Sequence, residues 1–344
     1  MLGAALVAAA LLSSCGTPPP APPPPPLPPA LVPPPITLSD RLVQDAAAYQ
    51  AYMTKVAAIT PGFKSGDDVA ASLKTGDSYD PGQLLRGSIA YAAIIALQDP
   101  TFVKEVQVFA ANPTSRPLLT NDIEGNPNYV VGLKGVDGAA GLVIANLMDQ
   151  GQKLYSSGEL VKQSAYSIQR QSWSQQLVVN REQRLADAKS VSSTALISST
   201  QDAQRLQQAA VGAAPMSLSP AASATQPYPP VVIRGLALAA LAVLGEAGDD
   251  HAAQIAPIVG ESVTAACLGD AKLNLYQCLA VSKPHYEDIF CLGQHVMMDT
   301  GQCVMISAGA PPPAYAPLAQ SKTEVAYVPL GSSKKTRHTK KTAQ

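Results

Sequence analysis

The sequence predicts an all-α protein: an irregular multi-helix domain with a long central helix hairpin and a disulfide-stapled C-terminal helix pair. Three observations support this prediction. Only four Phe and one Trp occur among 344 residues rich in Ala, Leu and Val, a composition that favours packed helices over sheets. Capping side chains and prolines mark several helix starts. Four cysteines lie within one stretch, residues 267 to 303.

The chain begins with an apolar run, residues 2 to 12, which is too short to span a bilayer but suits a signal peptide. Leu12-Ser13-Ser14-Cys15 follows this run and resembles a bacterial lipobox. The resemblance implies a signal peptide over residues 1 to 14 and a lipoprotein whose Cys15 carries the acyl chains. Gly16 stands where inner-membrane lipoproteins of Gram-negative bacteria often carry Asp, which implies the periplasmic face of the outer membrane. The alternative is a secretory signal that ends near an ordinary cysteine.

A proline-rich segment follows the cysteine. Residues 18 to 35 contain thirteen prolines, which predict a stiff polyproline II spacer of about 55 Å. We therefore interpret residues 15 to 38 as a lipid anchor and linker that hold the folded domain away from the membrane. The alternative is a ligand for a proline-binding domain.

Helix starts in the next part of the chain share one signal, a capping side chain. Ser39 precedes a helix that is expected to begin at Asp40 and to end at Pro61-Gly62. In three further cases proline occupies the first helical position, where its missing N–H costs nothing. These dipeptides are Asp80-Pro81, Asp99-Pro100 and Asn126-Pro127. The stretches after the last two are similar, which we interpret as a local repeat of helix entry rather than a solenoid.

Between Ala140 and Ser172 the sequence keeps a strict 4-3 spacing of seam residues. One position holds mostly small residues, and the other holds large ones. The residues are Ile144, Gly151, Gly158, Ala165 and Ser172 at the first, and Leu147, Leu154, Val161 and Ile168 at the second. Glycine inside a helix is unfavourable, so two glycines on a seam indicate close approach of a partner helix. We predict an intramolecular helix hairpin, with self-association through the same seam as the alternative.

The helical domain is predicted to extend over residues 39 to 211. Near its end, Asn180 and Gln183 look like a capping box that begins a charged helix to about Val191. Residues 212 to 230 are small, polar and punctuated by proline, and we interpret them as a loop or linker.

The C-terminal helical part, residues 231 to 308, is predicted to pack on the same core. Ile233 to Leu244 is apolar nearly all round but too short to cross a membrane, which predicts a buried core helix. Its sequence is similar to residues 89 to 97, and we expect the two segments to pair in the centre of the core.

The four downstream cysteines predict two disulfides, because their number is even and the expected compartment is oxidising. They are Cys267, Cys278, Cys291 and Cys303. If Ala271 to Ser282 is helical and Pro284 starts a second helix through Met298, antiparallel packing brings Cys278 opposite Cys291. Cys267 then pairs with Cys303.

Zinc is the alternative for this region, because several ligand types occur close together. They are His285, Glu287, Asp288, Cys291 and His295. No pair has the CxxC or HxxxH spacing of a strong site, so we predict no metal and no cofactor. The histidines are then expected at the surface of the disulfide-stapled helix pair.

Enzyme motifs are also missing from the sequence. There is no GxSxG, Walker or GxGxxG pattern, and Ser332 with Lys335 fits SxxK only inside a basic segment. We predict that the protein is not an enzyme. The alternative is a periplasmic hydrolase or metal enzyme built on residues 283 to 303, with His285 as base beside Glu287.

Residues 309 to 344 are predicted to form a disordered tail that is proline-rich at first and basic at its end. Five cations lie within eight residues: Lys334, Lys335, Arg337, Lys340 and Lys341. The whole chain has a formal net charge of -1, but the residues from Ala319 onward contribute +5, so the remainder carries -6. The near-zero total removes a whole-chain argument for nucleic acid. Lipopolysaccharide or peptidoglycan would be anionic partners for the tail; the alternative is a solubilising end.

Together these features predict a lipid-anchored protein of the outer membrane that faces the periplasm. We expect it to act as a structural or protein-interaction module of the cell envelope, with another envelope protein as partner.

Overall fold

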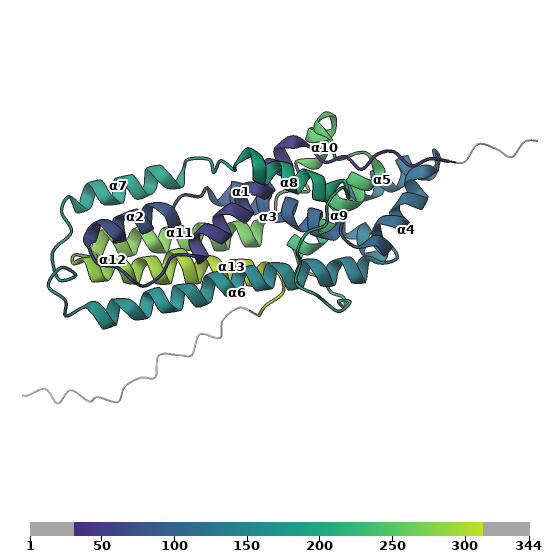
Figure 1. Cartoon of the computed structure of the whole chain (residues 1–344). Coiled ribbons are helices and arrows are strands. Elements are labelled where there is room, and N and C mark those ends of the chain that lie inside the picture. Colours follow the sequence, from purple (N-terminus) through teal and green to yellow (C-terminus); the bar gives the residue numbers. More distant parts are fainter. Residues whose placement is uncertain (1–30, 312–344) are drawn as a thin grey trace, which may run out of the picture.

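A computed structural model describes residues 31–311, which form an elongated bundle of helices (Figure 1). Thirteen α-helices are present, helix accounts for 69% of these residues, and none of them forms a β-strand. The predicted all-α fold is confirmed. The helices are α1 Asp40–Ala57, α2 Gly66–Gly76, α3 Pro81–Ala96, α4 Pro100–Ala111, α5 Ser115–Gly125, α6 Val136–Ile168, α7 Arg181–Ser192, α8 Thr200–Ala210, α9 Pro230–Leu244, α10 Ala252–Ile255, α11 Ser262–Val281, α12 His285–Cys291 and α13 Asp299–Ser307. Short 3-10 helices η1 and η2 cover Pro127–Gly132 and Asp249–His251, and a π-helical segment, η3, covers Leu292–Met298.

The predicted helix starts are confirmed by their hydrogen bonds. The side chain of Ser39 accepts a hydrogen bond from the N–H of Leu42 at the start of α1. Asp80 and Asp99 do the same for α3 and α4, each followed by proline at the first helical position. Asn126 also caps, but it opens the six-residue 3-10 helix η1. The similarity of the two proline stretches is therefore limited to the helix entry.

The glycine seam packs against the C-terminal helical segment of the same chain, η3 and α13, which runs antiparallel to α6. A Cβ atom on Gly151 would lie 2.7 Å from the carbonyl oxygen of Gly301, and one on Gly158 would lie 2.9 Å from that of Gly293. Only glycine allows the two backbones to approach so closely. The seam therefore has a partner within the chain, although this partner lies far from α6 in the sequence.

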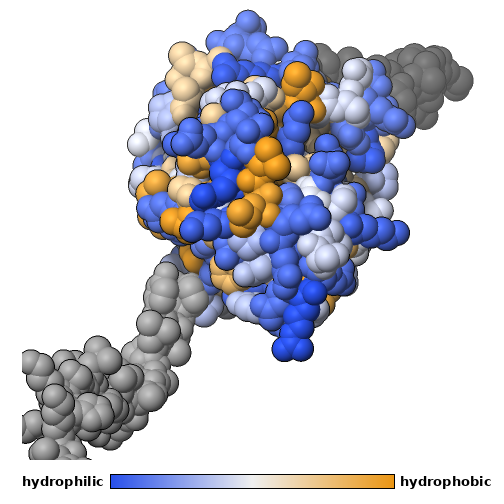
Figure 2. Space-filling view, turned by 90° about the vertical axis from the view of Figure 1, so that its left-hand side faces the viewer, coloured by the Kyte–Doolittle hydropathy of each residue, from blue (hydrophilic) through white to orange (hydrophobic). Residues whose placement is uncertain are grey.

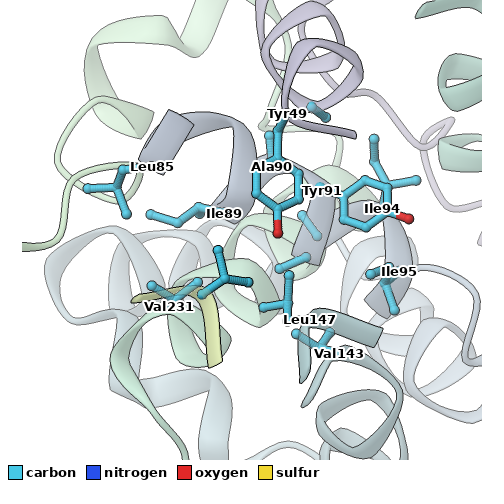
Figure 3. Close-up of a cluster of buried hydrophobic side chains, with 14 of the residues drawn as sticks. Tyr49, Leu85, Ile89, Ala90, Tyr91, Ile94, Ile95, Val143, Leu147 and Val231 are labelled. Carbon is cyan, nitrogen blue, oxygen red and sulfur yellow. The ribbon is translucent and has the colours of Figure 1, made fainter. Parts of the chain in front are cut away.

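The most apolar part of the core lies between α3 and α9, with α1 and α6 around them (Figure 3). All residues of α9 from Leu236 to Leu244 are fully buried, which confirms the predicted core helix. The predicted pairing with residues 89 to 97 is also confirmed, because a Cβ atom on Gly235 would lie 2.6 Å from that of Ala92. Small side chains thus let α3 and α9 pack closely.

The segment predicted as a loop or linker, residues 212 to 230, is a long loop that packs on α6. Asn146 exchanges two hydrogen bonds with the backbone of Ser219, and the N–H of Ala224 donates to the carbonyl of Asp137. Gly141 makes room for this loop, since a Cβ atom there would lie 2.0 Å from the carbonyl oxygen of Ala222.

The predicted capping box at Asn180 is wrong, although the helix that follows it is present. Asn180 has a left-handed backbone (φ 53°), and its side chain makes no capping hydrogen bond. The side chain of Gln183 donates to Asp187 instead of reaching back to the cap. Asn tolerates this backbone conformation. The turn at Asn180 leads into α7, two residues after the N–H of Val178 donates a hydrogen bond to the carbonyl of Lys283.

The structure has the predicted cysteine connectivity. Cys278 pairs with Cys291 and Cys267 with Cys303, each with a Cα–Cα distance of 5.7 Å. The two helices are longer than expected, because α11 begins at Ser262 and the second helical run continues past Met298 to Ser307. All four cysteines therefore lie within helical segments that face each other.

Several other predictions concern residues outside 31–311, among them the signal peptide over residues 1 to 14 and most of the proline-rich linker. Cys15 lies before the described part, and the basic tail residues Lys334, Lys335, Arg337, Lys340 and Lys341 lie after it. The lipid anchor and the role of the tail stay predictions. Among the described helices, none has both the length and the apolar character that crossing a membrane requires.

Candidate functional site

A cavity of about 980 Å³ opens between α2 and α7 at one end of the bundle. We call it the α2/α7 groove. Ala70 and Ala71 of α2 form one wall, Ala188 and Val191 of α7 form the opposite wall, and Leu279 of α11 lies at the floor. Its size falls at the upper end of the range found for ligand sites in proteins.

Further lining residues come from the irregular segment between α6 and α7. This segment contributes Trp173, the only tryptophan of the chain, together with Val178 and Val179. The side chain of Val179 is exposed by 79%. Figure 2 faces this end of the molecule and shows hydrophobic side chains gathered among hydrophilic ones. Val179 therefore places an exposed apolar side chain on the rim of the groove, among polar residues such as Asp67, Gln176 and Asp187.

A buried ion pair lies beneath the groove. Lys272 of α11 contacts the carboxylate and backbone carbonyl of Asp77, the residue that follows α2. The hydroxyl of Ser192, at the end of α7, donates to Asp77 over 2.8 Å and lies 3.1 Å from the Lys272 ammonium. The ammonium also lies 3.6 Å from the ring centroid of Tyr79. These contacts join three helices around one pair of charges.

Burial determines the titration of this pair. Removal from water lowers the pKa of Lys272 to about 8, and attraction to Asp77 offsets part of that shift. Burial likewise raises the pKa of Asp77, with Lys272 and Ser192 opposing it. Both groups are thus shifted toward their neutral forms, because desolvation exceeds their mutual attraction.

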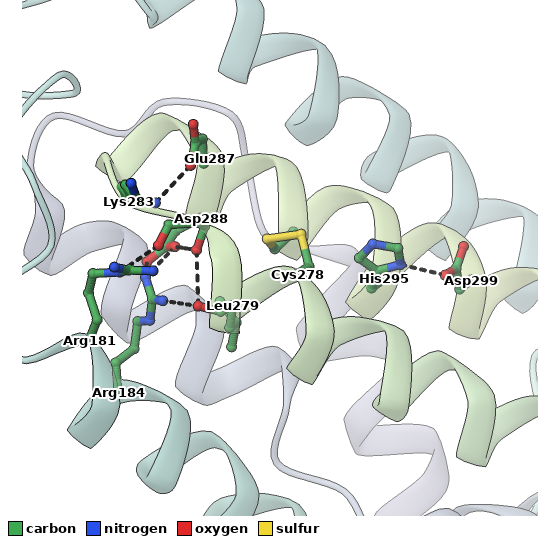
Figure 4. The surroundings of a disulfide bond; sticks show 11 residues. Arg181, Arg184, Cys278, Leu279, Lys283, Glu287, Asp288, His295 and Asp299 are labelled. Carbon is green, nitrogen blue, oxygen red and sulfur yellow. Dashed lines mark hydrogen bonds and ion pairs between the residues drawn. A yellow bond between two sulfur atoms is a disulfide. The ribbon is translucent and has the colours of Figure 1, made fainter.

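A second buried ion pair attaches the first turn of α7 to α12 (Figure 4). The guanidinium of Arg184 donates to both carboxylate oxygens of Asp288, at 2.5 and 2.7 Å. Ser282 donates to the same carboxylate at 2.7 Å. Burial raises the pKa of Asp288, and the bonds from Ser282 and Arg184 oppose this shift.

Arginines of α7 also bond to the C-terminal carbonyls of α11. Arg184 donates to the carbonyl of Leu279, and Arg181 donates to those of Ala280 and Ser282 at 3.0 and 2.7 Å. The last carbonyls of a helix have no partner within it, and cations there are favourable. Helix α7 is therefore held by polar contacts at both ends, while its middle lies over the groove.

The residues of the predicted zinc or hydrolase alternative are not brought together. His285 and Asp288 line the groove, and Cys291 is in a disulfide. Glu287 accepts a hydrogen bond from the N–H of Lys283, and His295 lies 2.8 Å from Asp299 (Figure 4). Within residues 31–311 no group of three or more His, Cys, Asp or Glu side chains has the spacing of a metal site.

Sequence reasoning missed three charged residues and one serine that organise the groove: Asp77, Arg184, Lys272 and Ser192. A signal existed for one of them. The buried side of α11 includes Leu268, Lys272, Leu275 and Leu279 at helical spacing, so Lys272 occupies a core position. A lysine on such a stripe indicates a buried acidic partner.

No protein-family model matches this chain, and neither the curated proteins nor the solved structures contain a significant match. The geometry of the groove therefore carries the functional argument.

Proposed function

We propose that this protein is a lipid-anchored module of the outer membrane that binds another envelope protein through the α2/α7 groove. The observation that carries the proposal is the groove itself, a large cavity with the exposed side chain of Val179 on its rim. Exposed apolar side chains beside a well-formed cavity are typical of interaction sites.

The position of the groove also supports the proposal. The described chain begins at the end of the bundle near α4 and α5, whereas α2 and α7 lie at the opposite end (Figure 1). A tether attached through Cys15 would leave the groove on the side away from the anchor, where it is accessible to a partner.

Binding fits the chemistry of the floor better than catalysis does. Asp77 and Lys272 are engaged with each other, and Arg184 is engaged with Asp288. Ser192 is 6% exposed and does not line the cavity. A nucleophile or general base must reach its substrate, and these groups are instead committed to holding helices together.

Membrane fractionation tests the anchor. Replacement of Cys15 by Ala is expected to move the protein from the membrane fraction to the soluble periplasm, because the acyl chains would be lost. Cys267→Ala/Cys303→Ala in a wild-type Cys15 background serves as control and should leave the protein in the membrane fraction. Retention of the Cys15→Ala variant in membranes would contradict the proposed anchor.

Site-specific cross-linking in intact cells tests the groove. A photoreactive amino acid at Val179, on the rim, is expected to capture one defined partner. The matched control is Val108 of α4, an exposed residue (68%) near the opposite end of the bundle. Equal adducts from both positions, or none from Val179, would count against the groove as the binding site.

A further inference from the structure

We propose that the α2/α7 groove also binds the chain's own basic segment, residues 331–344, which then competes with an external partner. This inference rests on the proposed function of the groove as a binding site. The inference names residues 331–344 as a ligand of the groove and implies that they inhibit binding of the external partner. Three observations carry it: the charge distribution of the chain, the exposed aspartates of the groove and the length of the connecting segment.

Charge is divided unequally along the chain. The segment from Ala319 onward contributes +5, and the rest of the protein carries -6. Five of the cations lie between Lys334 and Lys341. Attraction between the tail and the rest of the protein is therefore favourable at low salt. The tail should bind where acidic side chains have no basic partner.

The groove contains such groups. Four aspartates line it, against one lysine and one arginine. Two of the aspartates are compensated by the buried pairs with Lys272 and Arg184. Asp67 of α2 and Asp187 of α7 remain, both exposed at the rim and neither in an ion pair within the described residues, with Lys74 as the only opposing charge. A basic peptide between the two helices would meet one carboxylate on each side.

The connecting segment is long enough. The distance along the helical run from Ser307 at the end of α13 to His285 beside the groove is about 30 Å, from the helical rise per residue. The 23 residues between Pro311 and Lys334 reach at most about 75 Å when extended. Because both parts belong to one chain, the effective concentration of the tail at the groove falls in the millimolar range. Weak contacts are then sufficient for occupancy.

Trp173 allows a direct test, because it is the only tryptophan and lines the groove. The full chain is compared with a variant that ends at Leu330. Loss of the tail is expected to shift the tryptophan emission to longer wavelength, since water replaces the peptide. A labelled synthetic peptide of residues 331–344 should bind the truncated variant, measured by fluorescence anisotropy, and restore the original emission. Its affinity should fall steeply with salt, as expected for exposed charges.

Matched charge variants locate the binding site. Asp67→Asn/Asp187→Asn in the truncated protein is expected to weaken peptide binding about tenfold, the size of two exposed charge contacts. The control is Asp249→Asn/Asp250→Asn, which removes two exposed aspartates of η2, outside the groove, and should leave the affinity unchanged.

Three results would overturn the inference: no binding of the peptide, binding without a change in Trp173 emission, or equal affinities for the two double variants. None of these would bear on the cross-linking of Val179, which depends on an external partner. Conversely, peptide binding in the groove together with no cross-link at Val179 would support the tail contact and reject the proposed envelope partner.

Discussion

Around α3 and α9 the interior of the bundle is apolar and closely packed, whereas around α2, α7 and α11 it contains two buried ion pairs, two disulfides and a cavity. The first region is held by side chains that exclude water. The second is held by directional contacts between helices that do not fill the space between them.

This difference shows how one helical bundle can combine a rigid core with an open binding surface. Apolar packing closes every gap, because an unfilled void loses dispersion contacts. Buried ion pairs such as Arg184 with Asp288 hold a helix at a few points and leave space beside it. Four predictions test this difference between the two regions.

The largest effect is expected from the ion pair beneath the groove. Lys272→Met should lower the free energy of unfolding by about 3–5 kcal/mol, because it leaves Asp77 as an uncompensated buried acid. Urea denaturation with intact disulfides measures this change. The double variant Asp77→Asn/Lys272→Met removes both charges and should recover most of the loss. Equal stability of the single and double variants would show that pairing of the charges is unimportant.

The disulfides should come next. Loss of the Cys267–Cys303 bond, which closes 36 residues, is expected to cost about 4 kcal/mol, and loss of Cys278–Cys291, which closes 13, about 3 kcal/mol. Each pair is replaced by two alanines. Amide hydrogen exchange should increase mainly in α11, α12 and α13 while α3 and α9 stay protected. Uniform acceleration over all helices would mean that the two regions unfold as one unit.

Truncation in the apolar region should cost a similar amount but by another mechanism. Leu236→Ala in α9 removes a fully buried side chain and should destabilise by about 3 kcal/mol. Leu273→Ala, at an exposed position (52%) of α11, is the control and should change stability by less than about 0.5 kcal/mol. Thermal and urea unfolding measure both. A small effect at Leu236 would indicate that this core relaxes around the void.

The smallest effect is a pH dependence that Lys272 contributes. Its pKa is about 8 in the folded state, below the ordinary value of 10.5, so above pH 8 the unfolded chain binds more protons at this site. Its contribution to stability is therefore lost as pH falls through 8 and gained as pH rises, by at most about 2 kcal/mol at pH 9.5.

The comparison of wild type with Lys272→Met between pH 7.5 and 9.5 isolates this contribution. Measurements stay below pH 10 because burial raises the pKa of Tyr49, Tyr52 and Tyr79, whose titration acts in the opposite direction. A difference between wild type and variant that does not change with pH would contradict the lowered pKa of Lys272.

Much of the helical architecture followed from local signals. Asp80, Asp99 and Ser39 cap helices as predicted because capping needs only the first turn and one side chain. The prediction of a cap at Asn180 was wrong because Asn also adopts a left-handed backbone conformation, and Asn180 has that conformation in the structure. The glycines of α6 indicated that another helix packs closely on it. They did not indicate that this partner is the C-terminal segment of η3 and α13.

The sequence alone was sufficient to predict the all-α class, a core helix at Ile233 to Leu244, the helix entries and the cysteine pairing. These features depend on contacts between residues close in sequence and on the spacing of apolar residues, and both can be seen in the sequence. The packing of α6 on the C-terminal helices and the position of α7 across a groove became visible only in the folded protein. The same is true of the contact between Asp77, Ser192 and Lys272, which are separated by up to 195 residues. Such contacts depend on how all helices share one interior, and no local pattern encodes that arrangement.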